Sequence, residues 1–280
     1  YSDDNGLSWS EPQAVIDWGM NYEPRDPSPV LDRDTGEIFL FTRGGPWMTS
    51  SQDEGKTWSA PRSLVASAPG GFADFSPGTA NSAIQLRYGR FKGRLLVAVA
   101  CSNTIAMIFS DDHGRTWQPG ALAAWSAVSE PTLIELSDGR VLMSPRGGAS
   151  PKGERMFVFS NDGGATFAEI RFEPAVPIPG RGGELLAIEP QSEDVTGNVR
   201  PIIFCGPAGG ATRLTLKASL DDGRTWPISR ELDDGACGNL ALVALPDHQL
   251  GVIYERDKFR RQSFMHVDLE AVLEGNVHFG

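Results

Sequence analysis

The sequence lacks any apolar run approaching the roughly 18 residues that a membrane-spanning helix needs, so no membrane span is predicted. Positive charge is scarce: 25 Lys and Arg stand against 36 Asp and Glu, for a formal net charge of −11. Such a chain repels phosphate backbones, which argues against a nucleic-acid partner. Cysteine is also scarce, and the spacing of Cys101, Cys205 and Cys237 fits neither a metal site nor a redox motif. Their odd number argues against a complete disulfide framework, and no metal or organic cofactor is predicted.

Glycine and proline are abundant instead, at 32 and 20 of the 280 residues, which indicates many turns. Hydrophobic residues make up 40% and charged residues 22%, the composition of an ordinary globular protein. We predict a single domain over residues 1–280. The start at Tyr1, without Met or a signal-like segment, is compatible with a processed or trimmed chain. The sequence predicts neither a compartment nor an oligomeric state.

Five segments share the pattern Ser-x-Asp-x-Gly-x-Thr/Ser-Trp/Phe, called here the Asp boxes. They are Ser2–Trp9, Ser51–Trp58, Ser110–Trp117, Ser160–Phe167 and Ser219–Trp226. Self-similarity at such a period is typical of a propeller or a solenoid. Each box has the composition of a turn, because Ser and Asp side chains bond nearby backbone N–H groups and Gly supplies a positive φ. A calcium loop is disfavoured, since no bidentate Glu follows at the required spacing.

Short apolar runs between the boxes predict strands, about four in each period, which is the size of a propeller blade. The clearest runs are Pro29–Leu31, Ile38–Phe41, Leu95–Val99, Thr132–Leu136, Arg155–Phe159 and Leu250–Tyr254. Only Leu269–Leu273 has the pattern of a helical turn. The expected fold is therefore an all-β propeller.

Two periods carry an acid at the start of one strand and an arginine at the end of the next. Asp26 precedes Arg43 by 17 residues, and Glu130 precedes Arg146 by 16, with a tight turn between the two strands of each pair. In an antiparallel pair, the start of one strand lies beside the end of its neighbour. Each acid should therefore lie on the same rim as its arginine, and the Asp boxes should lie on the opposite rim.

Arg213 enters a predicted third strand, which starts at the rim of the acids. Because the innermost strands of a propeller converge on its channel, we expect Asp26, Glu130, Arg146 and Arg213 to meet there. Glu184 and Asn239 occupy comparable places in later periods, and Arg256 is a further candidate. Several arginines around a shallow pocket suit a carboxylate ligand, which they bind in a bidentate manner. The alternative is that each acid and its arginine form a local ion pair that ties a loop.

The five boxes, together with the segment Ser129–Arg146, resemble the sialidase (neuraminidase) family. Ile84–Gly89 and Gly251–Glu255 fit the habits of that family as well. The resemblance implies a six-bladed propeller that hydrolyses terminal α-sialosides with retention, using a Tyr nucleophile activated by a Glu. It also implies an Asp as the acid/base and three arginines that bind the sugar carboxylate.

By position, the resemblance assigns the Tyr-activating role to Glu130, the second arginine to Arg146 and the third to Arg213. Asp26 matches an acidic position that flanks the family pocket, and Tyr254 matches a later, non-nucleophilic Tyr. Arg43 is a further candidate for substrate binding.

Three expected groups are missing from the chain. The first arginine and the acid/base Asp of the family lie upstream of the first box. The stretch Ala236–Leu242, where the nucleophile belongs, contains no Tyr, and Cys237 or Asn239 stands there instead. A Cys can attack if its pKa is lowered. The chain thus supplies about five blades, either as a fragment or as a ring whose last blade is completed by the N-terminal box and a strand over Glu11–Ile16.

Three functions remain open. The first is a sialidase-like hydrolase of terminal sialic acid or a related acidic sugar of glycoconjugates. The second is an inactive propeller that binds acidic glycans, and the third is a structural scaffold. A secreted or periplasmic location would suit the family.

Overall fold

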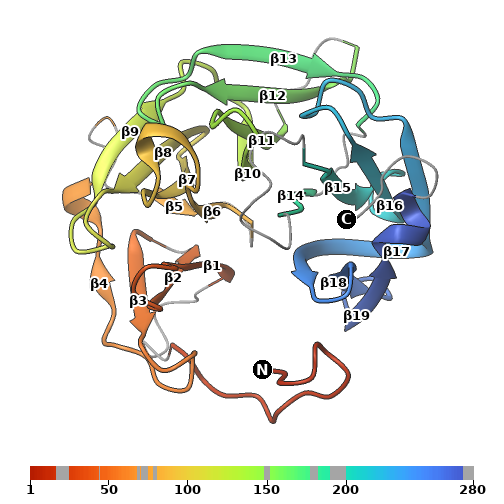
Figure 1. Ribbon diagram of the computed structural model, residues 1–280, viewed down its shortest axis with the longest axis horizontal. Helices are drawn as coiled ribbons and strands as arrows, with labels where there is room; N and C mark the ends of the chain where they lie inside the picture. Colours follow the sequence, from red (N-terminus) through yellow and green to blue (C-terminus); the bar gives the residue numbers. More distant parts are fainter. Residues whose placement is uncertain are drawn as a thin grey trace. The chain divides into compact units, whose positions relative to one another are not determined.

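The computed structural model describes residues 1–16, 25–43, 45–67, 70, 75–77, 81–147, 152–176, 182–189 and 200–273. Nearly all regular structure in these ranges is β-strand (Figure 1). The only α-helix among them is the short α1 (Leu269–Leu273), as the sequence predicted. No helix in these ranges is long and apolar enough to cross a membrane. The chain divides into two compact units, residues 15–173 and residues 1–14 with 174–280.

The unit of residues 15–173 contains three antiparallel sheets, each built from consecutive strands. The first sheet is β1 (Arg25–Leu31), β2 (Ile38–Arg43), β3 (Trp47–Ser51) and β4 (Arg62–Ser63). The second is β5 (Phe75–Pro77), β6 (Ala83–Gln85), β7 (Leu95–Cys101), β8 (Thr104–Ser110) and β9 (Gln118–Leu122), with β5 and β6 both paired to β7. The third is β10 (Val128–Glu135), β11 (Val141–Gly147), β12 (Arg155–Ser160) and β13 (Glu169–Glu173). The strands predicted in this unit fall within these elements, except that Thr132–Leu136 extends one residue past the end of β10.

The other unit contains one six-stranded sheet. Its strands are β14 (Glu184–Ala187), β15 (Ile202–Pro207), β16 (Thr212–Ser219), β17 (Ile228–Leu245), β18 (Gln249–Arg256) and β19 (Arg261–Asp268). The first part of β17, up to Ala236, pairs with β16, and the part from Cys237 pairs with β18. Strand β17 therefore continues from one meander into the next, and the described strands form four sheets where the sequence predicted about five blades.

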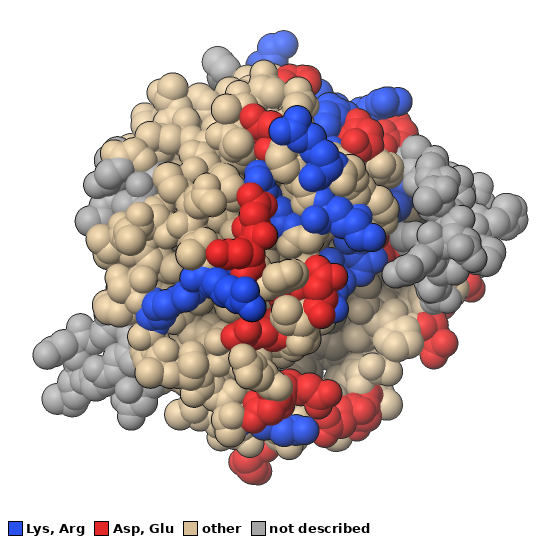
Figure 2. Space-filling model, turned by 60° about the vertical axis from the view of Figure 1, so that its left-hand side comes forward, with Lys and Arg blue, Asp and Glu red and all other residues tan. Residues whose placement is uncertain are grey.

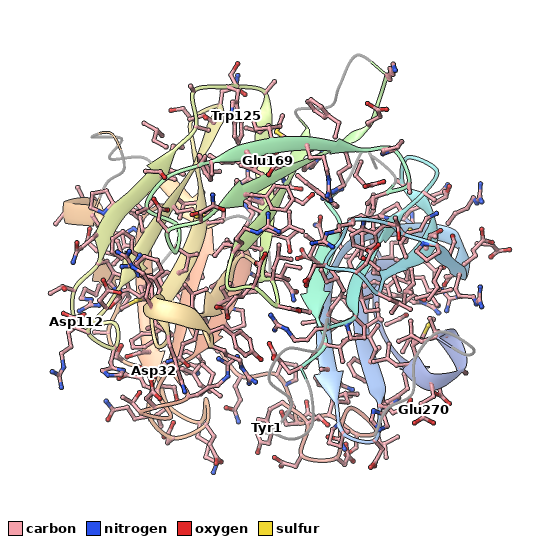
Figure 3. All side chains as sticks on the ribbon, turned by 45° about the horizontal axis from the view of Figure 1, so that its top comes forward. Tyr1, Asp32, Asp112, Trp125, Glu169 and Glu270 are labelled. Atoms are coloured by element: carbon pink, nitrogen blue, oxygen red, sulfur yellow. The ribbon has the colours of Figure 1, made fainter. Side chains whose placement is uncertain are left out.

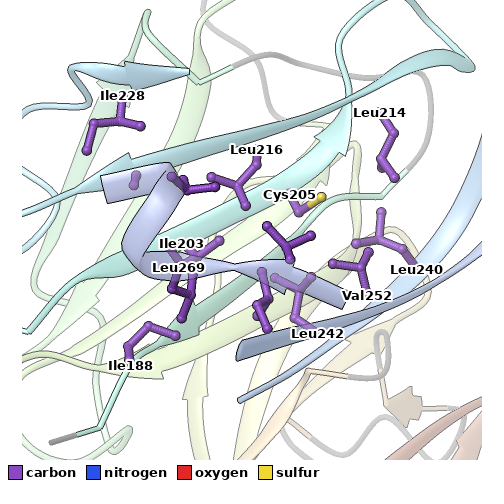
Figure 4. Packing of buried hydrophobic residues seen from close by; sticks show 14 of the residues in the cluster. Ile188, Ile203, Cys205, Leu214, Leu216, Ile228, Leu240, Leu242, Val252 and Leu269 are labelled. Carbon is purple, nitrogen blue, oxygen red and sulfur yellow. The ribbon is translucent and has the colours of Figure 1, made fainter. Parts of the chain in front are cut away.

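Apolar side chains from successive meanders pack against each other. Phe39 and Phe41 of β2 are buried with Val97 and Ile108 of the second sheet, and Trp117 stacks edge-on against both phenylalanines. A second cluster joins the other face of the second sheet to the third. In the other unit, β15 to β18 and α1 surround a third cluster that includes Cys205 (Figure 4). Burying each large apolar side chain stabilises the fold by about 1.5–3 kcal/mol.

The Asp boxes form the predicted turns. In the third box, Ser110 Oγ donates to Asp112 Oδ1 at 2.9 Å and accepts from Gly114 N at 2.9 Å. The other end of Asp112 accepts from the backbone N and the hydroxyl of Thr116, at 2.8 and 2.6 Å. The box lies between β8 and β9, the last two strands of its meander, and the second, fourth and fifth boxes occupy the same place. The prediction of a structural role for these aspartates is confirmed.

A box glycine also allows close packing between meanders. Gly114 has a φ of +73°, and a Cβ there would clash with the ring of Phe39 on the first sheet. Arg62 of β4 reaches across the same junction and donates to the backbone carbonyls of Gly114 and Arg115. The box is thus both a turn of its own meander and a contact surface for the preceding one.

The N-terminal box packs against β19 within the smaller unit. Trp9 stacks edge-on against Phe264 at 5.3 Å between ring centroids, and His266 Nε2 donates to the carbonyl of Asn5 at 2.8 Å. The expected strand over Glu11–Ile16 is wrong, because residues 1–16 contain no strand. The N-terminal box contacts β19 through these side-chain contacts and not through strand hydrogen bonds.

Candidate active-site rim

Asp26 and Glu130 occupy the same structural position in two meanders. Each lies in a β-bulge near the start of the first strand, where the register shifts between Arg25 and Ser28 or between Ser129 and Thr132. Their φ values are +49° and +44°, in the left-handed region, although a proline follows each of them. Such backbone costs of the order of 1–3 kcal/mol per residue and is concentrated at functional sites. The bulge turns each carboxylate toward the end of the neighbouring strand.

The structure brings four predicted site residues together in the larger unit. Arg43 Nη1 donates to Asp26 Oδ2 at 3.2 Å, and Arg146 Nη1 donates to Glu130 Oε1 at 2.8 Å. Arg43 Nη1 also lies 3.7 Å from Glu130 Oε1, so it links the two pairs across meanders. The expected placement of each acid beside its arginine is confirmed as geometry. We call these four residues the charged cluster.

Burial differs across the charged cluster. The Glu130 side chain is 13% exposed, whereas those of Arg146 and Arg43 are 33% and 47% exposed. Glu130 Oε2 is buried and accepts no hydrogen bond from any residue in the described part of the chain. A buried carboxylate oxygen without a donor is unusual and costly. The charged cluster therefore combines two partly exposed arginines with a buried oxygen, Glu130 Oε2, that has no donor among the described residues.

Arg213 belongs to the other unit. It lies near the start of β16, in a bulge, with a φ of +64° in the same left-handed region as Asp26 and Glu130. Its Nε donates to Glu231 Oε2 at 2.9 Å. Its expected meeting with Glu130 and Arg146 stays a prediction. Glu184 begins β14 and is buried, and Asn239 is exposed in the bulge between Cys237 and Leu240.

Cys237 has the properties of a core thiol. Its side chain is buried, and this burial, reinforced by the negative charge of Asp233, raises its pKa to about 11. A thiol at neutral pH is a poor nucleophile compared with a thiolate. The structure thus speaks against Cys237 as a replacement for the expected Tyr.

Asp233, Tyr254 and Arg256 form a second polar group, in the smaller unit. Asp233 Oδ2 accepts from the hydroxyl of Tyr254 at 2.7 Å and lies 3.0 Å from Arg256 Nε. These residues line a pocket of about 430 Å³. Burial and the hydrogen bond to Asp233 raise the pKa of Tyr254 to about 12, and the same bond lowers the pKa of Asp233. Arg256 was a predicted candidate, but Asp233, in an unremarkable Asp-Asp-Gly turn sequence, was missed.

Charge of both signs is mixed on the surface. On the face in Figure 2, acidic and basic side chains intermingle in a band beside a wide uncharged area. On the rim of the Asp boxes, one group of potential metal ligands is present within the described ranges: Asp32, Asp34 and His113.

Residues 1–238 match the family of BNR repeat-like domains. The chain belongs to this family. It is also 32% identical to a sialidase of Micromonospora viridifaciens over 289 residues, which cover 91% of this chain and 44% of that protein. Sialidase-4 of Mus musculus is 28% identical over 67% of this chain and 47% of its own length. The chain therefore spans about half the length of these relatives.

A solved structure, the Hadza microbial sialidase Hz136, superposes on 97% of this chain and 59% of its own with a TM-score of 0.82 and 23% identity. At that identity the likeness establishes the fold, which is the β-propeller of the sialidases. The resemblance drawn from the boxes and from the segment Ser129–Arg146 is confirmed. The roles of individual site residues remain predictions.

Proposed function

We propose that the protein recognises terminal sialic acid, or a closely related acidic sugar, on glycans, and that it acts on it as a sialidase-type glycoside hydrolase. The observation that carries the proposal is the charged cluster, with its buried free carboxylate oxygen, in a chain similar to sialidases. The relatives named above are sialidases, which supports sialylated glycans as the substrate class.

Arg146 is proposed to bind the carboxylate of the sugar. A guanidinium matches a carboxylate with two parallel hydrogen bonds, and its charge does not depend on pH in the physiological range. Arg146 is one third exposed, and Glu130 holds it on one side. Arg43 supplies a second positive charge beside the same acid. Arg213 is proposed as a further arginine of the site, and Asp26 as a group that flanks it.

Glu130 is proposed as the proton acceptor. Its Oε1 faces the two arginines, while the buried Oε2 lacks a donor among the described residues. An O–H group of the attacking nucleophile would satisfy Oε2 and pass its proton to it, as general-base catalysis requires. The proposal assigns the attack itself to no residue in the described ranges.

A second function, non-hydrolytic binding of acidic glycans, is favoured by one observation. The two residues nearest in character to a nucleophile in the smaller unit are Cys237 and Tyr254, and both are buried with a raised pKa. Neither is a ready nucleophile at neutral pH. The arginines alone suffice for binding, so this function needs neither a nucleophile nor an acid/base group. Under the third function, a scaffold, the charged cluster would be a set of structural ion pairs.

Hydrolysis of a fluorogenic α-sialoside separates these functions when binding of the same sugar is measured in parallel. The proposal expects turnover by the unmodified chain that is lost in Glu130→Gln, with binding retained. Binding without turnover supports the non-hydrolytic function. Neither binding nor turnover contradicts both functions and leaves the scaffold.

A further inference from the structure

Two aspartates and a histidine from different meanders converge on the rim of the Asp boxes. Asp32 and Asp34 belong to the tight turn between β1 and β2, and His113 belongs to the third box, before β9. Figure 3 shows Asp32 in the same region as Asp112, the neighbour of His113. The three residues can each offer one ligand atom, and all of these atoms lie within 4.8 Å of one another.

The spacing of the ligand atoms is close to that of a coordinated metal. His113 Nδ1 lies 2.8 Å from Asp32 Oδ2. Ligands about 2.0–2.2 Å from a tetrahedral Zn²⁺ lie roughly 3.3 Å apart. An opening of a few tenths of an ångström would therefore admit the ion between these two atoms. Asp34 is exposed, and its ligand atom already lies within 4.8 Å of the other two.

The other oxygens of both carboxylates are held by an outer partner. Gln85 Nε2 donates to Asp32 Oδ1 at 2.9 Å and to Asp34 Oδ2 at 3.2 Å, and Asp34 N also donates to Asp32 Oδ1 at 3.0 Å. The orientation of the Gln85 amide is itself fixed, since its Oε1 accepts from Arg33 N at 2.8 Å. Hydrogen bonds to the non-coordinating oxygens are the arrangement that orients carboxylates in metal sites.

One of the two carboxylates in the group is buried. The Asp32 side chain is fully buried, and its hydrogen bonds come from Asp34 N, Gln85 and His113. Its only ion-pair partner in the described part of the chain is His113, which carries charge only when it is protonated. Buried carboxylates in proteins are paired with a cation or coordinate a metal. A divalent ion bound by both carboxylates would be such a partner.

We propose that Asp32, Asp34 and His113 form a site for Zn²⁺ that joins the first and second meanders of the larger unit. An imidazole with two carboxylates suits Zn²⁺, whereas Ca²⁺ needs six to eight oxygen ligands that this turn does not provide. Solvent would complete the coordination. The site is structural, is separate from the charged cluster and does not depend on the proposed function. It departs from the sequence-based expectation that no metal is bound.

The test is a calorimetric titration of the metal-free chain with ZnCl₂ at pH 7, in a buffer that does not chelate. The proposal expects binding of one equivalent, weakened at least tenfold in Asp34→Asn and in His113→Gln. Glu37→Gln, in the same turn but outside the cluster, is the matched control and should bind as the unmodified chain does. Co²⁺ in place of Zn²⁺ should give an intense visible absorption band that is lost in His113→Gln.

Two results would overturn the site: no binding of Zn²⁺ by the unmodified chain, or equal binding by the unmodified chain and Asp34→Asn. Asp34 is exposed, so its amide variant should fold, and a thermal melt followed by circular dichroism verifies this. If His113→Gln fails to fold, Asp34→Asn alone decides the question.

Discussion

Arg146 donates a 2.8 Å hydrogen bond to one carboxylate oxygen of Glu130, while the other oxygen of that carboxylate is buried and has no donor among the described residues. A purely structural ion pair would satisfy both oxygens, because leaving one buried and unsatisfied costs about 1–3 kcal/mol. The strained backbone of Glu130, with its φ of +44°, adds to this cost. Both features favour a functional role for Glu130 and Arg146 over a purely structural ion pair.

Replacing Glu130 with Gln should abolish turnover of an α-sialoside and leave binding nearly intact. The amide keeps the shape of the side chain but cannot accept the proton, and general-base catalysis contributes about 10²–10⁴-fold in rate. Steady-state kinetics on a fluorogenic sialoside would show a fall in kcat with little change in KM. An equal kcat for the two proteins would remove Glu130 from the chemistry.

Arg146→Gln should weaken sialoside binding more than Arg43→Gln does. Arg146 is the less exposed of the two and is bonded to Glu130 at 2.8 Å, whereas Arg43 is nearly half exposed and 3.7 Å from that acid. Hydrogen bonds to charged groups contribute about 1.5–3 kcal/mol, so we expect a loss of roughly tenfold to a hundredfold for Arg146. Isothermal titration with each variant gives the two values. The reverse order would mean that Arg43 is the principal carboxylate-binding group.

Cys237→Ala should leave the rate of any sialoside hydrolysis unchanged. The thiol is buried and its pKa is raised to about 11, so almost none is ionised at pH 7. Treatment of the folded chain with iodoacetamide should likewise leave Cys237 unmodified, as peptide mass spectrometry would detect. Rapid alkylation that also stops turnover would restore Cys237 as the nucleophile.

The Asp boxes should make the fold sensitive to acid. Hydrogen bonds from the Thr57 side chain and backbone lower the pKa of Asp53 to about 2, and Thr166 likewise lowers that of Asp162 against the opposing effect of burial. Because these pKa values lie below those of the unfolded chain, about 3.9, their stabilisation is present above that pH and is lost as the pH falls toward 2. Urea unfolding between pH 7 and pH 2.5 should show this decline.

Asp162→Ala isolates one box. It removes the acceptor of the Thr166 backbone and hydroxyl bonds, 2.8 and 2.6 Å long, and should lower the free energy of unfolding at pH 7 by about 1–3 kcal/mol. The variant should also lose part of the dependence on pH. Unchanged stability at pH 7 would contradict the structural role of the box.

The fold followed from local patterns that the sequence displays directly. The boxes repeat the same side-chain-to-backbone bonds, and the strand β10 with its partner β11 could be paired from the turn between them. The position of Glu130 beside Arg146 followed from the same pairing. Contacts of this kind depend only on residues that are close along the chain.

The specific contacts between meanders could not be predicted from the sequence. The approach of Arg43 to Glu130 joins residues 87 positions apart and depends on how two sheets pack. The bulges were also missed, because a proline after Asp26 or Glu130 favours an extended backbone for the preceding residue, and tertiary structure overrides that preference. The strand expected over Glu11–Ile16 was wrong because, in the described part of the chain, this segment pairs with no strand.

Recognition of a sialoside by the unmodified chain tests the central claim most directly. The measurement is a calorimetric titration with 3′-sialyllactose and, separately, with lactose, which lacks only the acidic sugar. The account predicts saturable binding of sialyllactose that is weakened in Arg146→Gln, and no binding of lactose under the same conditions. Equal binding of the two sugars, or binding of neither, would contradict recognition through the charged cluster.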